Sequence, residues 1–327
     1  MRISVIGTGH LGTIHSRLWA QHSTAKLSGI YDVDSTRATA IAAEYSTTAH
    51  SSIQDAIENC DAVTIAVPTS EHFRVAMECI EAGKHCLIEK PITHTYDEAQ
   101  ELIRAAAEKN VILQVGHVER FNPAFVAAQS YSLSPLFIEA HRLSQFRPRA
   151  TDVSVIHDLM IHDIDIVLWL VKSPAVSISA NGVAVLTDTP DIANARVEFA
   201  NGAVANFTAS RLSANAMRKM RIFQRDAYLS LDFSKPSVEV YRIADDDMPS
   251  SGIPAMMLGQ IDAGTHKKSI MFEQPTVPQL NAIAEEQNSF VESVVNGAPI
   301  SVSAADAAEA LRIASEIATI VESRKEL

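Results

Sequence analysis

The stretch Gly7-Thr8-Gly9-His10-Leu11-Gly12 decides how the first part of the chain is expected to fold. It follows an apolar run, Ile3–Ile6, that is typical of a strand, and it opens a helical pattern over Leu11–Gln21. In a G-x-G-x-x-G turn the first glycine allows the sharp turn, the second lets a pyrophosphate approach the backbone, and the third lets helix and strand pack closely. The N–H groups of the helix N-terminus then face the phosphates. Strand, turn and helix together predict a dinucleotide site, and the alternative is a glycine turn that holds no cofactor.

Asp32 follows the second predicted strand, Lys26–Tyr31, and lies 20 residues beyond Gly12. A carboxylate at this spacing is placed to bind the hydroxyls of the adenosine ribose. We therefore predict NAD rather than NADP as the cofactor. Arg37 is the competing signal, because a guanidinium near the ribose suits a 2′-phosphate, although Asp34 beside it opposes that role.

Strand-like runs alternate with helical patterns through the first 120 residues. Alternation of this kind produces right-handed crossovers and a mainly parallel sheet. We predict an α/β fold, with a Rossmann doubly wound parallel sheet in residues 1–120. Its further strands are expected at Ala62–Val67, His85–Glu89 and Val111–Val115, and its further helices at Ser35–Glu44, Glu71–Ala82 and Tyr96–Lys109.

Residues 121–327 show a different pattern, which predicts a second, α+β domain with an open, mostly antiparallel sheet. One helix is expected over Val155–Val171, and Asn201-Gly202 between two apolar runs is typical of a hairpin turn. Residues Ala244–Thr276 are interpreted as a long loop with one embedded strand near Ser269–Phe272. Two helices, Gln279–Val295 and Ala304–Ser323, are expected after it. The remaining strands are expected at Ala195–Phe199, Ala203–Ala209, Lys219–Phe223, Tyr228–Phe233 and Ser237–Arg242.

The composition restricts the possible partners. The 327 residues are 47% hydrophobic and carry a formal net charge of −12, which argues against nucleic acid and anionic membranes as ligands. No apolar stretch approaches the roughly 20 residues of a membrane span, and no signal peptide is recognisable. Cys60, Cys79 and Cys86 have no regular spacing, which favours reduced thiols in a cytoplasmic protein.

Glu89-Lys90-Pro91 follows a predicted strand at the sheet edge where α/β proteins bind ligands. Pro91 cannot continue the ladder, so the chain turns there and projects its neighbours into the crevice. A lysine beside an oxidised nicotinamide has its pKa lowered by the like charge and by desolvation, which suits it to proton exchange with a hydroxyl. The alternative is a surface lysine paired with Glu89.

The segment His157–Asp165 is rich in histidine and aspartate. Asp158 and His162 are four residues apart and share one face of the predicted helix, so the carboxylate can orient the imidazole. Asp165 follows on much the same face. A metal site is the second interpretation, but no cysteine or third suitably spaced histidine supports it, and we predict none. A solvated charged helix face is the third, and the apolar residues that flank the segment argue against it.

The chain resembles the Gfo/Idh/MocA oxidoreductase family over nearly its full length. The resemblance implies that Lys90, Asp158 and His162 are the catalytic lysine and the Asp-x-x-x-His pair of that family. It also implies that the open sheet of the second domain forms a homodimer or homotetramer. In place of the glycine run that many members carry before the aspartate, this chain has Val153–His157. The matching motifs, in family order, are Gly7–Gly12, Asp32-Val33-Asp34, Ala66-Val67-Pro68-Thr69 with His72, Ala82-Gly83-Lys84-His85, Glu89-Lys90-Pro91, Gly116-His117, Arg120-Phe121-Asn122-Pro123, and Asp158 with His162.

The segments Gly116–Ala124 and Asp158–Asp165 are most similar to the family branch that oxidises UDP-N-acetylglucosamine at the 3-hydroxyl. Guanidinium groups suit a diphosphate, and arginines gather just before the catalytic helix; ordinary surface arginines are the alternative. We expect Val67, Pro68, Thr69, His72, Glu89 and Lys90 to join the cofactor site. We expect substrate to be bound by Lys90, His117, Arg120, Asn122, Arg147, Arg149, Asp158 and His162. His141 and Arg142 belong to the same basic cluster.

The hypothesis is an NAD-dependent sugar dehydrogenase. Lys90 or His162 takes the hydroxyl proton, Asp158 orients the base, and a hydride passes to the nicotinamide. Three other functions stay open at this point. They are a polyol dehydrogenase of the inositol type or a ketosugar reductase, a redox-neutral NAD-dependent glycosidase, and a dinucleotide-sensing regulator without catalysis.

Overall fold

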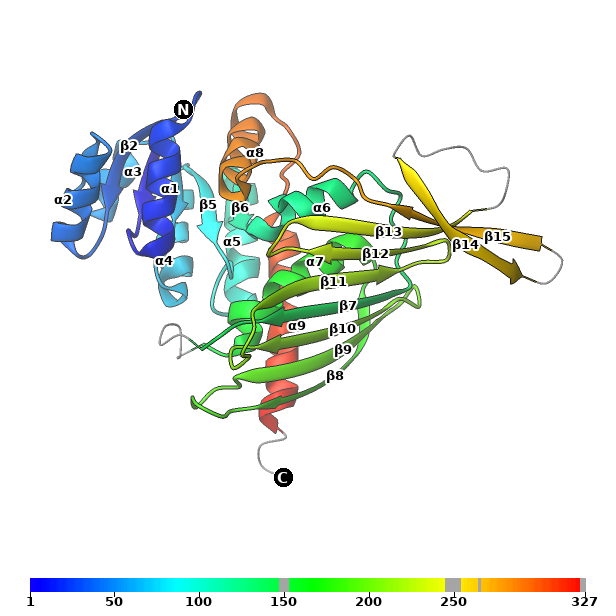
Figure 1. The fold of residues 1–327 in the computed structure, drawn as a ribbon. Coiled ribbons are helices and arrows are strands. Elements are labelled where there is room, and N and C mark those ends of the chain that lie inside the picture. The colour runs from blue at the N-terminus through cyan, green and yellow to red at the C-terminus, as the bar shows by residue number, and fades with distance from the viewer. Residues whose placement is uncertain (147–152, 245–253, 264–265, 324–327) are drawn as a thin grey trace. The chain divides into compact units, whose positions relative to one another are not determined.

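The chain forms two compact units in a computed structural model that describes residues 1–146, 153–244, 254–263 and 266–323 (Figure 1). The first unit comprises Met1–Val118 and Asn281–Arg312, and the second comprises Glu119–Leu280 and Ile313–Leu327. The prediction that every residue after 120 belongs to the second domain is wrong for residues 281–312. They return to the first unit because apolar side chains of that segment complete its core.

The first unit contains a six-stranded parallel sheet in the order β3-β2-β1-β4-β5-β6. The predicted Rossmann fold is confirmed. Its strands are β1 (Arg2–Ile6), β2 (Lys26–Tyr31), β3 (Thr48–Ala49), β4 (Ala62–Ile65), β5 (His85–Glu89) and β6 (Leu113–Gly116). Its helices are α1 (His10–Gln21), α2 (Ser35–Glu44), α3 (Ile53–Glu58), α4 (Thr69–Glu81), α5 (Tyr96–Lys109) and α8 (Ala282–Asn296), with the start of α9 (Ala304–Ser323).

Helix boundaries in this unit follow from local signals. Thr95 and Glu98 form a capping box at the start of α5. Asn281 caps α8, and Gly297 ends that helix in the left-handed conformation that glycine adopts readily. One face of the sheet is covered by Trp19 of α1 and Phe290 of α8, both fully buried, which explains why α8 belongs to this unit.

The second unit is built on a nine-stranded sheet in the order β14-β15-β13-β12-β11-β7-β10-β9-β8, and only β7 and β10 pair in parallel. The predicted open, mostly antiparallel sheet is confirmed. Its strands are β7 (Phe137–Leu143), β8 (Ala175–Val183), β9 (Ile192–Phe199), β10 (Val204–Ser210), β11 (Met217–Phe223), β12 (Ala227–Asp232), β13 (Ser237–Ala244), β14 (Ala255–Ala263) and β15 (His266–Glu273). The helical segments are a 3₁₀ turn (Val118–Phe121), α6 (Pro123–Ala128), a π-helical turn (Ile156–Met160) and α7 (Ile161–Val171).

Two predictions fail in this unit. The long loop with one short strand is wrong, because β14 and β15 pair over eight positions as an antiparallel hairpin. The single regular helix over Val155–Val171 is wrong in its first turn, which is π-helical before α7 begins. The Asn201-Gly202 hairpin is confirmed between β9 and β10, with Gly202 at a φ of +86°.

No described helix has both the length and the apolar character that a membrane span requires.

Candidate active site

The glycine turn after β1 has the shape that a pyrophosphate requires. Gly7 has a φ of +90°, and a Cβ on Gly12 would lie 1.9 Å from the carbonyl oxygen of Gly7. A Cβ on Gly9, in contrast, would meet no protein atom within 4 Å. The first and third glycines are therefore needed for packing, while the second leaves open space at the N-terminus of α1 that a phosphate fits.

Asp32 is held in place by hydrogen bonds from three neighbouring residues. The backbone N–H and Oγ1 of Thr8 donate to its Oδ2 at 2.6 and 2.7 Å, and the N–H of Asp34 and the Nη2 of Arg37 donate to its Oδ1 at 2.9 and 2.8 Å. Partial burial opposes ionisation, but these donors prevail and lower the pKa of Asp32 to about 2. A fixed carboxylate suits ribose hydroxyls and repels a 2′-phosphate. Arg37, the competing signal, is bound to that carboxylate.

A cavity of about 470 Å³ in the first unit joins the glycine turn to Asp32. Six predicted cofactor residues line it: Gly7, Gly9, Asp32, Arg37, Val67 and Pro68. Sequence reasoning missed Val33, which is 90% exposed at its wall; an apolar residue directly after the ribose carboxylate is the signal that was available. The other lining residues are Ile6, Tyr31, Ile53, Ala66, Glu71, Arg74 and Val75.

The other predicted cofactor residues are not among those that line this cavity. His10 and Leu11 are exposed in the first turn of α1, and Thr69 begins α4. His72 is buried, with Nδ1 2.8 Å from the Pro91 oxygen and Nε2 3.0 Å from the Val67 oxygen. Burial lowers the pKa of His72, and the contacts of its ring tie the loop after β4 to the loop after β5.

Glu89 and Lys90 stand at the carboxyl end of β5, joined to Pro91 by a cis peptide bond. The Glu89 carboxylate accepts a hydrogen bond from His15 Nε2 at 2.8 Å and from the Lys90 N–H at 3.3 Å. Gln287 of α8 donates to His15 Nδ1 at 3.1 Å, which fixes the tautomer that donates to Glu89. Glu89 therefore holds the backbone before Lys90.

Glu286, next to Gln287 on α8, is a buried carboxyl group. Its side chain has no hydrogen-bond partner among the described residues. Burial and the negative charge of Glu89 raise the pKa of Glu286 well above its ordinary value. The folded chain therefore favours the protonated form of this carboxyl group.

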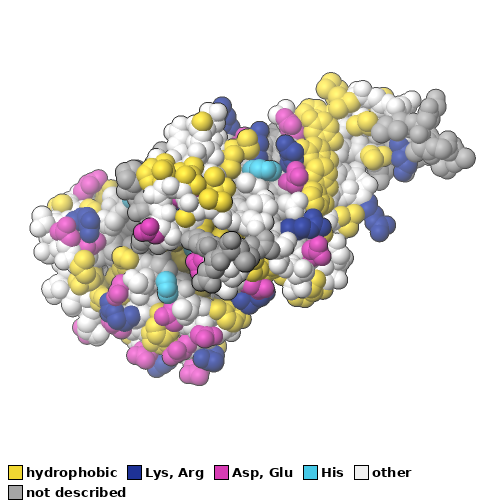
Figure 2. All heavy atoms as spheres, turned by 90° about the horizontal axis from the view of Figure 1, so that it is seen from below, with side chains coloured by type: hydrophobic (Ala, Val, Ile, Leu, Met, Phe, Trp, Pro, Cys, Tyr) yellow, Lys and Arg dark blue, Asp and Glu magenta, His cyan; other side chains and the backbone are white. Residues whose placement is uncertain are grey.

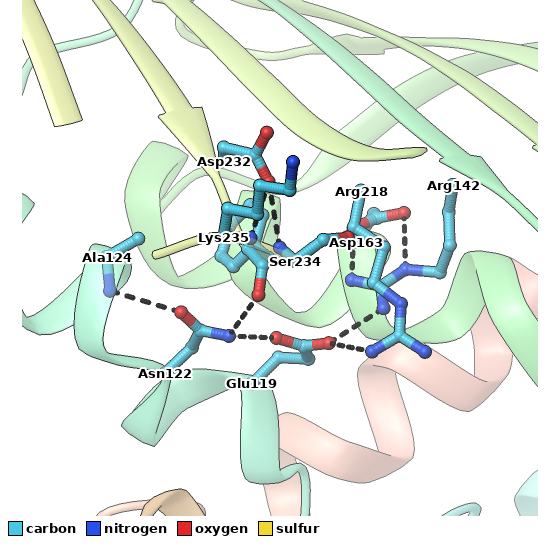
Figure 3. Close-up of polar contacts among 10 residues, drawn as sticks. Glu119, Asn122, Ala124, Arg142, Asp163, Arg218, Asp232, Ser234 and Lys235 are labelled. Atoms are coloured by element: carbon cyan, nitrogen blue, oxygen red, sulfur yellow. Dashed lines mark hydrogen bonds and ion pairs between the residues drawn. The ribbon is translucent and has the colours of Figure 1, made fainter. Parts of the chain in front are cut away.

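In the second unit, the acidic residues of α7 are largely used in buried ion pairs. Arg120 donates to both oxygens of Asp165 at 2.7 Å. Arg142 donates to Asp163 at 3.0 and 2.8 Å and to Glu119 at 2.7 Å (Figure 3). The described residues contain no group of three or more His, Cys, Asp or Glu side chains placed to hold a metal.

These pairs change the interpretation of the predicted substrate residues. Arg142 is 2% exposed, so it supports the fold instead of belonging to a surface basic cluster. Arg120 is almost as buried. Asn122 caps α6 through its Oδ1 and donates its Nδ2 to Glu119 at 3.0 Å and to the Phe233 oxygen at 3.2 Å. Arg147 and Arg149 lie outside the described residues.

Asp158 and His162 sit on either side of the junction between the π-helical turn and α7. Asp158 lines a polar cavity of about 200 Å³ together with Leu143, Ser144, Gln145, Leu159, Arg211, Ala216 and Arg218. A π-helical turn is rare and often marks a functional site, because it changes where side chains point. His157, the neighbouring histidine, lies 3.1 Å from Ser154 Oγ and 3.3 Å from Ser315 Oγ. His117 is fully buried in the first unit.

The parallel sheet, the glycine turn and the fixed ribose carboxylate define an NAD-dependent oxidoreductase with a Rossmann domain. A family model described as the oxidoreductase family with an NAD-binding Rossmann fold matches residues 1–117, and the GFO/IDH/MocA C-terminal domain model matches residues 124–230. The chain belongs to the Gfo/Idh/MocA family, which confirms the resemblance found in the sequence.

Individual proteins and solved structures of known activity show which members of the family this chain is similar to. UDP-N-acetylglucosamine 3-dehydrogenase of Acidithiobacillus ferrooxidans is 39% identical over 295 residues, which cover 90% of this chain and 92% of that protein. A solved structure of that enzyme superposes with a TM-score of 0.89 at 36% identity and covers 99% of this chain and 98% of the other. The scyllo-inositol 2-dehydrogenase (NAD(+)) of Bacillus subtilis is 30% identical and covers 65% of this chain and 68% of that protein.

Proposed function

We propose that the chain oxidises the 3-hydroxyl of UDP-N-acetylglucosamine to a 3-keto sugar nucleotide. The observation that carries the proposal is the 39% identity to a UDP-N-acetylglucosamine 3-dehydrogenase along 90% of this chain. Lys90, Asp158 and His162, the residues that the family resemblance assigns to catalysis, are all present. A dinucleotide-sensing regulator would not need these three groups together.

The proposed roles follow the chemistry of each group. The bound dinucleotide supplies the hydride acceptor. Lys90 or His162 takes the proton from the sugar hydroxyl, and Asp158 orients the base. Glu89 fixes the backbone that carries Lys90 through its contacts with His15 and with the Lys90 N–H.

The experiment that tests the function is NADH formation at 340 nm with UDP-N-acetylglucosamine, free N-acetylglucosamine or inositol as substrate. We expect a signal with the nucleotide sugar alone. Oxidation of inositol would favour the polyol dehydrogenases, of which one is 30% identical over a smaller part of the chain. Release of a leaving group without NADH would favour redox-neutral glycosidase chemistry.

The assignment of Lys90 is tested by Lys90→Met, with Lys109→Met at the exposed end of α5 as the matched control. General-base groups typically contribute about 100- to 10,000-fold to a rate. We expect Lys90→Met to lose at least about 100-fold in turnover while it still binds NADH, and the control to remain active. A Lys90→Met enzyme with normal turnover contradicts the assignment.

We further propose that two or more copies associate through the open face of the second unit's sheet. An aromatic row crosses that face, with neighbouring ring centroids 4.8–5.8 Å apart. Burial alternates along these strands, so the rings point away from the buried face. Figure 2 shows hydrophobic side chains gathered in patches on the face that it draws, and such patches often mark interaction sites. The row consists of Phe137, Phe223, Tyr228, Tyr241 and Phe272.

Light scattering of the wild type and of Tyr228→Glu tests this association. We expect a dimer or tetramer that the charged variant dissociates, and a monomeric wild type contradicts the proposal. The cytoplasm remains the proposed location, supported by three buried free thiols that suit a reducing compartment.

A further inference from the structure

One arginine in the wall of the cavity beside Asp158, Arg218, lacks the short carboxylate contacts that hold the buried Arg142 and Arg120. Arg142 and Arg120 are bound by carboxylates at 2.7–3.0 Å. Arg211, also in the cavity wall, is 7% exposed beside Asp191 and donates to the Val153 carbonyl oxygen. Arg218 is 52% exposed, and its ion pair with Glu119 is long, at 3.6 Å.

The long contact has a structural cause that Figure 3 makes visible. The Glu119 oxygen that faces Arg218 already accepts a hydrogen bond from Arg142 at 2.7 Å, and its other oxygen accepts one from Asn122 at 3.0 Å. Glu119 is thus held by two buried or half-buried neighbours and cannot move toward Arg218. The Arg218 guanidinium is oriented by this carboxylate but keeps donors for an anion in the cavity.

Strand register places Arg218 on the correct face for this role. Arg218 pairs with Arg142 across β11 and β7, and Arg142 points to Asp163 of α7. Arg218 therefore lies on the helix-covered face of the sheet, where Asp158 also lines the cavity, and not on the aromatic face. The remaining wall offers polar groups from Ser144 and Gln145.

We propose that Arg218 binds the diphosphate of the sugar nucleotide and so selects nucleotide sugars over free sugars. The inference rests on the proposed function. A guanidinium matches phosphate geometry with paired, charge-assisted hydrogen bonds. Because Arg218 is half exposed, little desolvation opposes the exchange of its long contact with Glu119 for a phosphate. The sequence pattern assigned this task to the arginines of the basic cluster, Arg142, Arg147 and Arg149, whereas the described cavity offers Arg218.

Binding and turnover are measured separately. Isothermal titration with UDP, at saturating NAD so that the dinucleotide cavity is filled, compares wild type with Arg218→Ala and Arg218→Lys. We expect the alanine variant to bind UDP about 10- to 100-fold more weakly, the range of a charge-assisted hydrogen bond, and the lysine variant to recover part of the loss. Arg2→Ala is the matched control, since Arg2 is 53% exposed, pairs with Asp61 and begins β1.

Steady-state kinetics then separate a binding role from a structural one. We expect Arg218→Ala to raise the KM for UDP-N-acetylglucosamine by the same factor, with the KM for NAD unchanged and kcat within about threefold. Equal UDP affinity in wild type and Arg218→Ala overturns the inference, as does a wild type that binds no UDP. If Arg218→Ala binds a uronic-acid sugar nucleotide more weakly but binds UDP normally, Arg218 contacts a sugar carboxylate, and the inference is overturned. If wild type binds UDP through Arg218 but oxidises no UDP-N-acetylglucosamine, the proposed function fails and the Arg218 assignment stands.

Discussion

Replacing Gly12 by alanine should destabilise the first unit. The new Cβ would lie 1.9 Å from the carbonyl oxygen of Gly7, where real Cβ contacts stay beyond 3.0 Å, so backbone must move by about 1.1 Å. Overpacking of this kind costs up to about 3 kcal/mol, and the better helix propensity of alanine within α1 returns about 1 kcal/mol. The net loss is about 2 kcal/mol, which for a domain of this size lowers Tm by about 6 °C.

Gly9→Ala provides the matched comparison. Its Cβ would meet no protein atom within 4 Å, and the Gly9 backbone, at φ −63° and ψ −161°, is one that alanine adopts without strain. Without cofactor, we expect its Tm to stay within about 1 °C of the wild type. With NAD, the methyl group occupies the space that the pyrophosphate needs, and affinity should fall at least about 10-fold.

Differential scanning calorimetry without cofactor and isothermal titration with NAD measure the two effects. A Gly9→Ala protein as unstable as Gly12→Ala would refute the assignment of packing to Gly12 and of open space to Gly9. Normal NAD affinity in Gly9→Ala would refute the phosphate cradle.

Three other changes test the buried charges. Because the pKa of Glu286 is raised in the folded state, the wild type loses stability as pH rises from the ordinary glutamate pKa through the raised one, by about 1.4 kcal/mol for each pH unit between the two values. Glu286→Gln removes this loss, so its advantage in denaturant unfolding should be larger at pH 8 than at pH 5. A pH-independent difference would contradict the raised pKa of Glu286. Arg120→Met leaves the Asp165 carboxylate buried without its partner and should lower the free energy of urea unfolding by about 3–5 kcal/mol. The double variant Arg120→Met with Asp165→Asn should recover much of this free energy. If it does not, packing dominates the effect of the substitution. Asp32→Ala should lower the ratio of kcat/KM for NAD to that for NADP at least about 10-fold, and an unchanged ratio would remove Asp32 from cofactor selection.

The cofactor half of the chain was predictable because its signals are local. Glycine spacing, a carboxylate after β2 and caps such as Thr95 are each read within a few residues. The strands β2 and β5 and the helices α2, α5 and α9 match their predicted bounds.

The second unit was less predictable because its decisive contacts are distant in sequence. β7 was not predicted because its buried face includes Arg142, and arginine is typical of protein surfaces. Arg142 can be buried because Asp163 and Glu119 pair with it. β14 was missed because its three consecutive apolar residues, Met256–Leu258, are exposed and show no alternation. The π-helical turn before α7 has no sequence signal that periodicity could detect.

The return of α8 to the first unit also has a consequence for the order of events during synthesis. Phe290 and Val291 fill the same core as Ile3 and Trp19, yet the ribosome must first make the whole segment between Val118 and Asn281. At about 5–20 residues per second, this delay is roughly ten to thirty seconds. During that interval the part of the apolar face that α8 covers stays exposed in the nascent Rossmann sheet, although α1 is already made.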